Sequence, residues 1–213
     1  GKGRQADGVI ALDQSAIAML IEGLGALQVE GYPHPVSGEN VLEVAKEAWA
    51  PKAGITKEWW EHRKDFMAGL MRAALRRLEE EPDQVEWAKL AGALWQALQE
   101  RHILVFVRDD GPAEWLQAQG WDGALRDTPG DFLMVLDTNM GFNKANALVE
   151  QSLEYLVDLS YPEEPRAELR VRHTHPLQGW QGVCRQEARY DITYAQMTQR
   201  CYWNYLRVLA PRG

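Results

Sequence analysis

The chain has 213 residues, a mass of 24.2 kDa and a formal net charge of -8. Its 46% hydrophobic residues suffice for one large domain or two small ones. An acidic chain without a concentrated basic face is not expected to bind nucleic acid, and apolar runs as short as these cannot cross a bilayer. We therefore expect a soluble protein with no transmembrane segment in this chain.

The N-terminal part alternates strands with helices. The apolar run "DGVIALD" predicts a strand, and Asp13 at its end can cap a helix over residues 14–27. A longer helix is predicted through residues 56–82, with one apolar face formed by Trp60, Met67, Met71, Ala74 and Leu78. A further helix precedes the apolar strand "HILVFV", and a short helix then leads to the strand "DFLMVLD". This order is typical of an α/β arrangement.

From Ala147 the pattern changes to strict alternation. The first run places Val149, Gln151, Leu153, Tyr155 and Val157 on one side, and the second places Ala167, Leu169, Val171 and His173 on one side. The pair predicts an antiparallel hairpin, joined by a final strand at "YLRVLAP". We therefore predict an α/β (α+β) fold, with a mixed sheet flanked by helices over residues 1–146 and an antiparallel β-rich part over residues 147–213.

The stretch "LDTNMGFNKAN" joins these two parts and has two interpretations. Its glycine, the amides of Asn139 and Asn143 and the charge of Lys144 suit the binding of an anion. Asparagine and glycine are also the residues that turns prefer where φ is positive. The turn is the simpler interpretation, because the stretch lacks the spacing of a phosphate-binding loop and a strand follows it. Lys144 is the residue that a turn does not require.

Other chemical motifs are sparse. His173 and His175 would face the same way on a strand, but no third ligand is evident, so no metal site is predicted. No arrangement of Ser, His and Asp, of Cys and His, or of paired carboxylates identifies catalytic residues. Cys184 and Cys201 would pair in an oxidising compartment and remain thiols in the cytosol, and composition leaves both alternatives open.

Four segments carry a resemblance to a known family: "DGVIALDQSAIAMLIEGLGALQVEGY", "HRKDFMAGLMRAAL", "GWDGALRDTPGDFLMVLDTNMGFNKAN" and the closing "YWNYLRVLAPRG". Together they resemble a bacterial cell-surface family catalogued as domain of unknown function four thousand and twelve. That family is distantly similar to the LytR-CpsA-Psr enzymes, which transfer polyprenyl-diphosphate-linked glycopolymers onto peptidoglycan outside the cell.

The resemblance implies an extracytoplasmic, cell-surface location and, with it, a disulfide between Cys184 and Cys201. The function it implies first is a cell-envelope domain that binds or scaffolds a surface glycopolymer. In the enzymes, several residues that hold the diphosphate precede the segment matching "DGVIALD". The resemblance therefore implies either that this chain is a piece of a longer, membrane-anchored protein or that its diphosphate site is incomplete.

The alternative function that the resemblance implies is a phosphotransferase-like enzyme acting on isoprenoid-diphosphate-linked glycan. In the enzymes an Arg-Gln pair opens the helix that corresponds to "HRKDFMAGLM", and here Arg63 and Lys64 stand there. Only the arginine matches. In this alternative Arg63 and Lys144 would neutralise phosphate charge, with a divalent cation such as magnesium as cofactor.

Overall fold

The computed structural model describes residues 6–50, 56–126, 128, 130–161, 164–177, 182–187 and 191–211. The chain divides into two units, which are described separately below. Unit 1 comprises Gly1–Trp49 and Trp60–Thr128, and unit 2 comprises Ala50–Trp59 and Pro129–Gly213.

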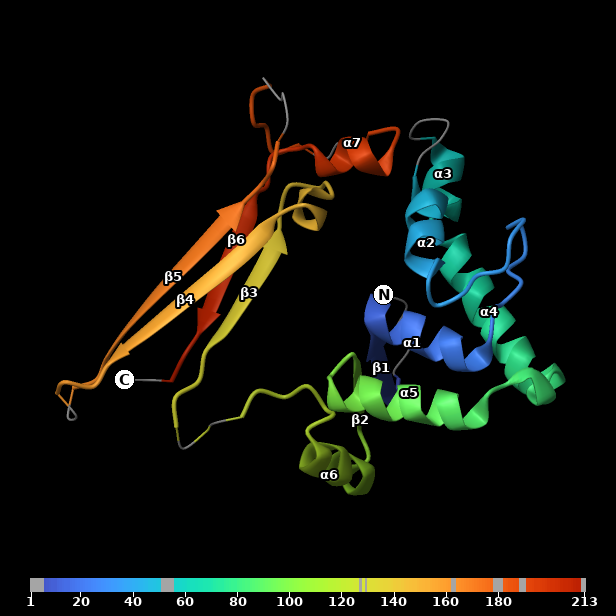
Figure 1. Ribbon diagram of the computed structural model, residues 1–213, viewed down its shortest axis with the longest axis horizontal. Helices are drawn as coiled ribbons and strands as arrows, with labels where there is room; N and C mark the ends of the chain where they lie inside the picture. Colours follow the sequence, from blue (N-terminus) through green and yellow to red (C-terminus); the bar gives the residue numbers. More distant parts are fainter. Residues whose placement is uncertain are drawn as a thin grey trace. The chain divides into compact units, whose positions relative to one another are not determined.

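Helices and strands follow one another along the chain as in Figure 1. In order they are β1 (Gly8–Leu12), α1 (Gln14–Leu24), α2 (Val41–Trp49), α3 (Lys57–His62), α4 (Asp65–Glu80), η1 (Pro82–Gln84), α5 (Trp87–Gln99), β2 (Ile103–Val107), α6 (Asp110–Gln119), β3 (Met134–Asn139), η2 (Ala145–Ala147), β4 (Glu150–Asp158), β5 (Arg166–Thr174), α7 (Tyr194–Thr198) and β6 (Asn204–Leu209).

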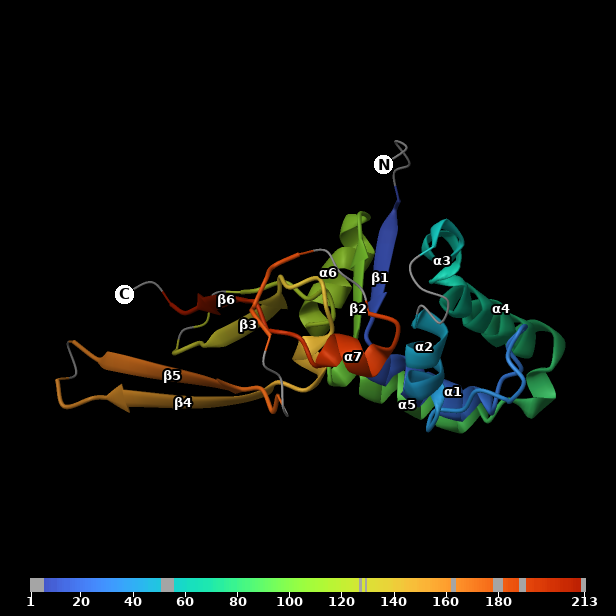
Figure 2. The same ribbon diagram turned by 90° about the horizontal axis from the view of Figure 1, so that it is seen from above.

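Unit 1 is built around the antiparallel helices α1 and α5, which lie side by side in Figures 1 and 2. Helix α1 begins as predicted, because Asp13 Oδ1 accepts a hydrogen bond from the backbone N–H of Ala16 at 2.9 Å. Asp13 Oδ2 also lies 2.7 Å from His102 Nδ1, just before β2. The carboxylate therefore joins the start of α1 to the end of the β1–β2 pair, whose strands run antiparallel.

The face of α4 that meets the core of unit 1 overlaps only in part with the predicted one, because Ala74 and Leu78 pack against the core as predicted. Phe66 and Leu70 are buried against Ile21 of α1, whereas the predicted core residues Met67 and Met71 are 44% and 57% exposed. The predicted helix over residues 56–82 is interrupted between α3 and α4. Because successive residues of a helix differ in direction by about 100°, Met67 and Met71 lie beside the face that Phe66 and Leu70 bury.

Unit 2 consists mainly of two ribbons, β3 paired with β6 and β4 paired with β5, both antiparallel. The predicted hairpin is confirmed, with Gln151 opposite His173 and Leu153 opposite Val171. The final strand pairs with β3 instead of joining the hairpin. For that reason β3 belongs to unit 2, and the division falls after Thr128 instead of near residue 147.

These elements make a mixed α+β fold, in agreement with the predicted class. Within the described residues the strands form three separate two-stranded antiparallel sheets in place of one mixed sheet. No helix in the described part of the chain is both long enough and apolar enough to cross a membrane.

The contact between α1 and α5 gives a test of the fold of unit 1. A Cβ added at Gly23 of α1 would lie 2.5 Å from Leu90 Cα, whereas one added at Gly92 of α5 meets nothing within 4 Å. We expect Gly23→Ala to destabilise unit 1 by about 1–3 kcal/mol through overpacking. Gly92→Ala should stabilise it by about 0.5–1 kcal/mol, because alanine favours the helix.

Urea unfolding followed by far-ultraviolet circular dichroism measures both changes in the free energy of unfolding. Equal effects of the two substitutions would contradict the close approach of α1 to α5.

Candidate functional site

The asparagine loop, residues 139–146, follows β3 and is held by its own side chains. Asn143 Oδ1 accepts hydrogen bonds from Asn139 Nδ2 and from the backbone N–H of Ala145, both at 2.9 Å. Asn143 Nδ2 donates to the carbonyl of Cys201 at 3.0 Å, and Asn139 Oδ1 accepts from the Gly141 N–H at 2.9 Å. These amides therefore serve the conformation of the loop, as the turn interpretation predicts.

Glycine is required where the loop passes closest to the chain before β6. A Cβ at Gly141 would lie 2.6 Å from Asn143 Nδ2 and 3.1 Å from Trp203 Cδ1, so a larger residue would push the loop away. The next residue, Phe142, has a φ of 54°, which is uncommon for a residue other than glycine. The loop is thus held in one conformation by close contacts.

A cavity of about 330 Å³ lies beside this loop. Among the described residues three segments line it: the asparagine loop, the residues just before β6, and residues 182–187, which we call the wall segment. The lining residues are Gly141, Asn143, Gly182, Val183, Arg185, Glu187, Arg200 and Cys201.

Among the described residues, a disulfide and a hydrogen bond hold the wall segment against the rest of unit 2. The disulfide between Cys184 and Cys201, with Cα atoms 5.7 Å apart, joins the wall segment to the chain before β6. Gln186 Nε2 donates to the carbonyl of Met140 at 2.9 Å and joins it to the asparagine loop. The structure thus contains the disulfide that the family resemblance implies, at the edge of a cavity that no sequence pattern indicated.

The two arginines of the cavity differ in their partners. Arg200 forms a two-pronged ion pair with Asp191, with Arg200 Nε donating to Oδ2 at 2.8 Å and Nη2 donating to Oδ1. The side chain of Asp191 is only 9% exposed, so this pair is part of the framework. Arg185 is exposed, and within the described residues its guanidinium has no ion pair or hydrogen bond.

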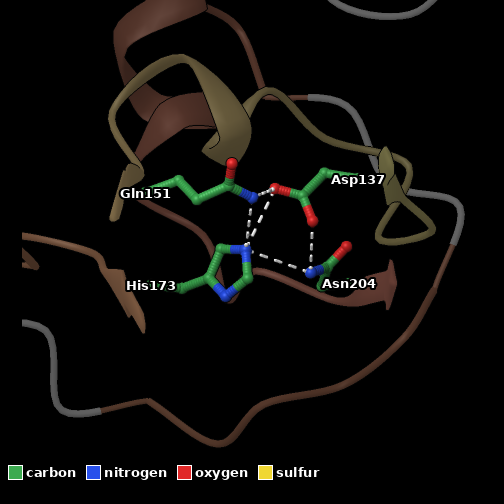
Figure 3. A network of polar contacts seen from close by, with 4 residues as sticks. All are labelled: Asp137, Gln151, His173 and Asn204. Atoms are coloured by element: carbon green, nitrogen blue, oxygen red, sulfur yellow. Dashed lines mark hydrogen bonds and ion pairs between the residues drawn. The ribbon is translucent and has the colours of Figure 1, made fainter. Parts of the chain in front are cut away.

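A second polar group, the Asp137 cluster, lies where the two ribbons of unit 2 meet. It consists of Asp137, Gln151, His173 and Asn204, one from each of the four strands (Figure 3). Asp137 Oδ2 accepts hydrogen bonds from His173 Nε2 at 2.9 Å and from Gln151 Nε2, and Oδ1 accepts from Asn204 Nδ2 at 2.8 Å. The carboxylate therefore has three donors.

The Asp137 cluster is half-buried and its charge reaches a neighbouring tyrosine. The side chains of His173 and Asp137 are 21% and 26% exposed. The ring of Tyr202 lies 5.8 Å from that of His173, and burial together with the negative charge of Asp137 raises the pKa of the Tyr202 hydroxyl above its ordinary value. An aspartate that orients a histidine is an arrangement used in general base catalysis. Here the same carboxylate is also bound by two amides that link the ribbons, which favours a structural role.

The two histidines predicted to share a face have separate partners. His173 binds Asp137, whereas His175 Nε2 lies 2.9 Å from the carbonyl oxygen of Arg200. The part of the chain that the structure describes contains no group of three or more His, Cys, Asp or Glu side chains placed to hold a metal ion.

The other residues expected to bind a ligand lie at different places. Asn139 and Asn143 meet in the asparagine loop, and Lys144 is half-buried there, with its backbone N–H donating to the carbonyl of Met197 at 3.2 Å. Arg63 belongs to unit 1, between α3 and α4, where its Cζ lies 4.3 Å from the centre of the Trp60 ring and Nη1 donates to the Trp60 carbonyl. Its guanidinium is thus engaged in local contacts.

The sequence interpretation missed Arg185, Arg200 and the partners of His173. One signal for the Asp137 cluster was present, because Gln151 and His173 are the polar members of two otherwise apolar strand faces. Nothing comparable marks the wall segment, which has no helix or strand period.

Comparison with protein-family models, curated proteins and solved structures finds no match for this chain. The resemblance to the cell-surface family and to the LytR-CpsA-Psr enzymes therefore stays a prediction from the sequence.

The role of Asn143 can be tested by substitution. Asn143→Ala removes the bonds to Cys201, Ala145 and Asn139, and we expect it to destabilise unit 2 by about 2–3 kcal/mol. Asn146→Ala is the matched control, because exposed Asn146 accepts a single bond from Asn139 and should cost less than about 1 kcal/mol. Urea titration of the amide NMR signals of β3 and β6 measures both. Similar costs for the two variants would show that Asn143 does not organise the loop.

The influence of Asp137 on Tyr202 gives a second test. Asp137→Asn removes a negative charge that disfavours the phenolate, so the pKa of Tyr202 should fall while its burial keeps it above the ordinary value. Tyr155 is the internal control, since the pKa of Tyr155 is raised by its hydrogen bond to Asp131 and should not change. A pH titration of tyrosine ring signals by NMR reports both, and an unchanged Tyr202 would contradict the proximity of its hydroxyl to Asp137.

Proposed function

We propose that this protein acts in a bacterial cell envelope, outside the cytoplasm, and that unit 2 binds a surface glycan in the cavity beside the disulfide. The observation that carries the proposal is the cavity itself, which a disulfide-held segment lines on one side. The family resemblance independently implies a domain that binds or scaffolds surface glycopolymer.

The disulfide supports the proposed compartment. Structural disulfides persist in oxidising surroundings and are rare in the cytosol of most organisms. Cys184 and Cys201 are the only two cysteines of the chain, and they are paired with each other. A bond that also forms part of a cavity wall has a use in an oxidising compartment, because it keeps the wall segment in place.

The chemistry of the cavity supports a hydroxyl-rich ligand. At about 330 Å³ it lies at the small end of the range for ligand sites, which suits a sugar residue or the end of a glycan chain. Its lining includes the guanidinium of Arg185 and the carboxylate of Glu187, so a ligand can both donate and accept hydrogen bonds there. Asn143 holds the asparagine loop and the disulfide holds the wall segment, so both sides of the cavity are fixed before a ligand binds. Fixing the site in advance lowers the entropic cost of binding.

The test is an NMR titration of the nitrogen-15-labelled chain with three sugars: N-acetylglucosamine, N-acetylmuramic acid and N-acetylglucosamine phosphate. We expect at least one sugar to shift the amide signals of the asparagine loop and the wall segment in the oxidised protein. Reduction of the disulfide, or Cys184→Ser with Cys201→Ser, should weaken that binding about tenfold or more because the wall is released.

The signals of α1 and α5 in unit 1 serve as the control and should not shift. Absence of shifts with all three sugars would overturn the proposal. Geranyl diphosphate with Mg²⁺ forms a separate arm, and its binding in the absence of any sugar binding would replace the proposal with the phosphotransferase alternative.

A further inference from the structure

We infer that the cavity of unit 2 recognises a negatively charged group of the glycan, a carboxylate or a phosphate, and that Arg185 is the residue that binds it. This inference rests on the proposed function and adds the chemistry of the ligand and the residue that selects it.

The charge of Arg200 is already balanced by its ion pair with Asp191. Both prongs of its guanidinium that face Asp191 are occupied, and its backbone carbonyl lies 2.9 Å from His175 Nε2. An arginine in such a two-pronged pair has little capacity to attract a further anion, and moving it would remove an ion pair from the nearly buried carboxylate of Asp191. Arg200 therefore belongs to the framework of the cavity.

The charge of Arg185, unlike that of Arg200, is not balanced by an ion pair among the described residues. It lines the cavity, and none of the described residues provides its guanidinium with a carboxylate or carbonyl acceptor. A guanidinium presents parallel N–H groups that match the oxygens of a carboxylate or a phosphate. An arginine that lines a cavity without a partner can use this geometry for a ligand.

The residues before and after Arg185 are both held by contacts to other parts of unit 2. Cys184 before it is joined to Cys201 by the disulfide, and Gln186 after it is bonded to the Met140 carbonyl. The side chain therefore starts from a fixed point on the wall, opposite the fixed asparagine loop. Fixing the anchor of a long side chain reduces the freedom lost when a ligand binds.

Because the protein as a whole is acidic, the binding of an anion in the cavity depends on Arg185. With a net charge of -8 the chain does not attract anions at long range, so selectivity for one has to arise from a short-range contact. The arrangement therefore suits recognition of a single anionic group among hydroxyls, and not general binding of polyanions.

The experiment compares sugars that differ in one substituent. N-acetylmuramic acid adds a lactyl carboxylate to N-acetylglucosamine, and the phosphate ester adds a phosphate to the same ring. Dissociation constants are measured by NMR titration for the wild-type chain, Arg185→Gln, Arg185→Lys and the control Arg207→Gln. Arg207 is an exposed arginine on β6 of the same unit and does not line the cavity.

In the wild-type chain we expect one or both anionic sugars to bind about tenfold more tightly than the neutral one. Arg185→Gln should abolish this difference without changing the affinity for the neutral sugar. Arg185→Lys should keep part of the difference, because it retains the charge but not the paired donors. Arg207→Gln should behave as wild type, and the carboxylate and phosphate arms identify which group is preferred.

Two results would count against the inference, and they differ in meaning. Equal binding of neutral and anionic sugars, or an undiminished preference in Arg185→Gln, overturns the role of Arg185 and leaves the glycan-binding proposal standing. Failure of all sugars to bind the oxidised wild-type chain overturns both. Because Arg185 is exposed, its substitution should leave the amide spectrum of β3 to β6 unchanged, and that spectrum verifies folding.

Discussion

The carboxylate of Asp137 is the interaction on which the arrangement of unit 2 depends. A two-stranded ribbon alone is marginally stable in water, and unit 2 contains two of them. Asp137 on β3 accepts hydrogen bonds from Gln151, His173 and Asn204, so one side chain is bonded to a residue on each of the other three strands. A hydrogen bond from the Tyr155 hydroxyl to Asp131 adds a second link between the ribbons at 2.7 Å. Since hydrogen bonds are directional, these contacts fix the register of the ribbons as well as their proximity.

The position of the cavity follows from that arrangement. Two residues after Asp137, β3 ends at Asn139, which is paired in register with Asn204 of the same cluster. The asparagine loop starts there and is closed by the bond from Asn143 to the Cys201 carbonyl. Cys201 in turn holds the wall segment through the disulfide. The chain of contacts from Asp137 to the wall is continuous, so a change in the packing of the ribbons would be transmitted to the cavity.

Features set by neighbouring residues were predictable from the sequence, and features set by distant ones were not. The cap at Asp13 and the hairpin of β4 and β5 depend on short-range pattern, and both were predicted. The pairing of β6 with β3 is a tertiary choice that alternation in a single strand does not specify. The burial of Phe66 and Leu70 in place of Met67 and Met71 likewise depends on which side of α4 meets α1. The wall segment has no periodicity at all, so the cavity and Arg185 appear only once the chain is folded.

The same distinction explains why the anion expected at Lys144 is now proposed at Arg185. Sequence chemistry correctly identified the asparagine loop as unusual, but its amides are used to bind one another and the chain before β6. A loop whose hydrogen-bond donors are satisfied internally can form a rigid side of the cavity, but it offers few donors to a ligand. We assign the proposed recognition to Arg185, which lies on the disulfide-held wall segment and whose guanidinium has no partner among the described residues. The disulfide and the hydrogen bond of Gln186 hold the wall segment, and neither of them uses the side chain of Arg185.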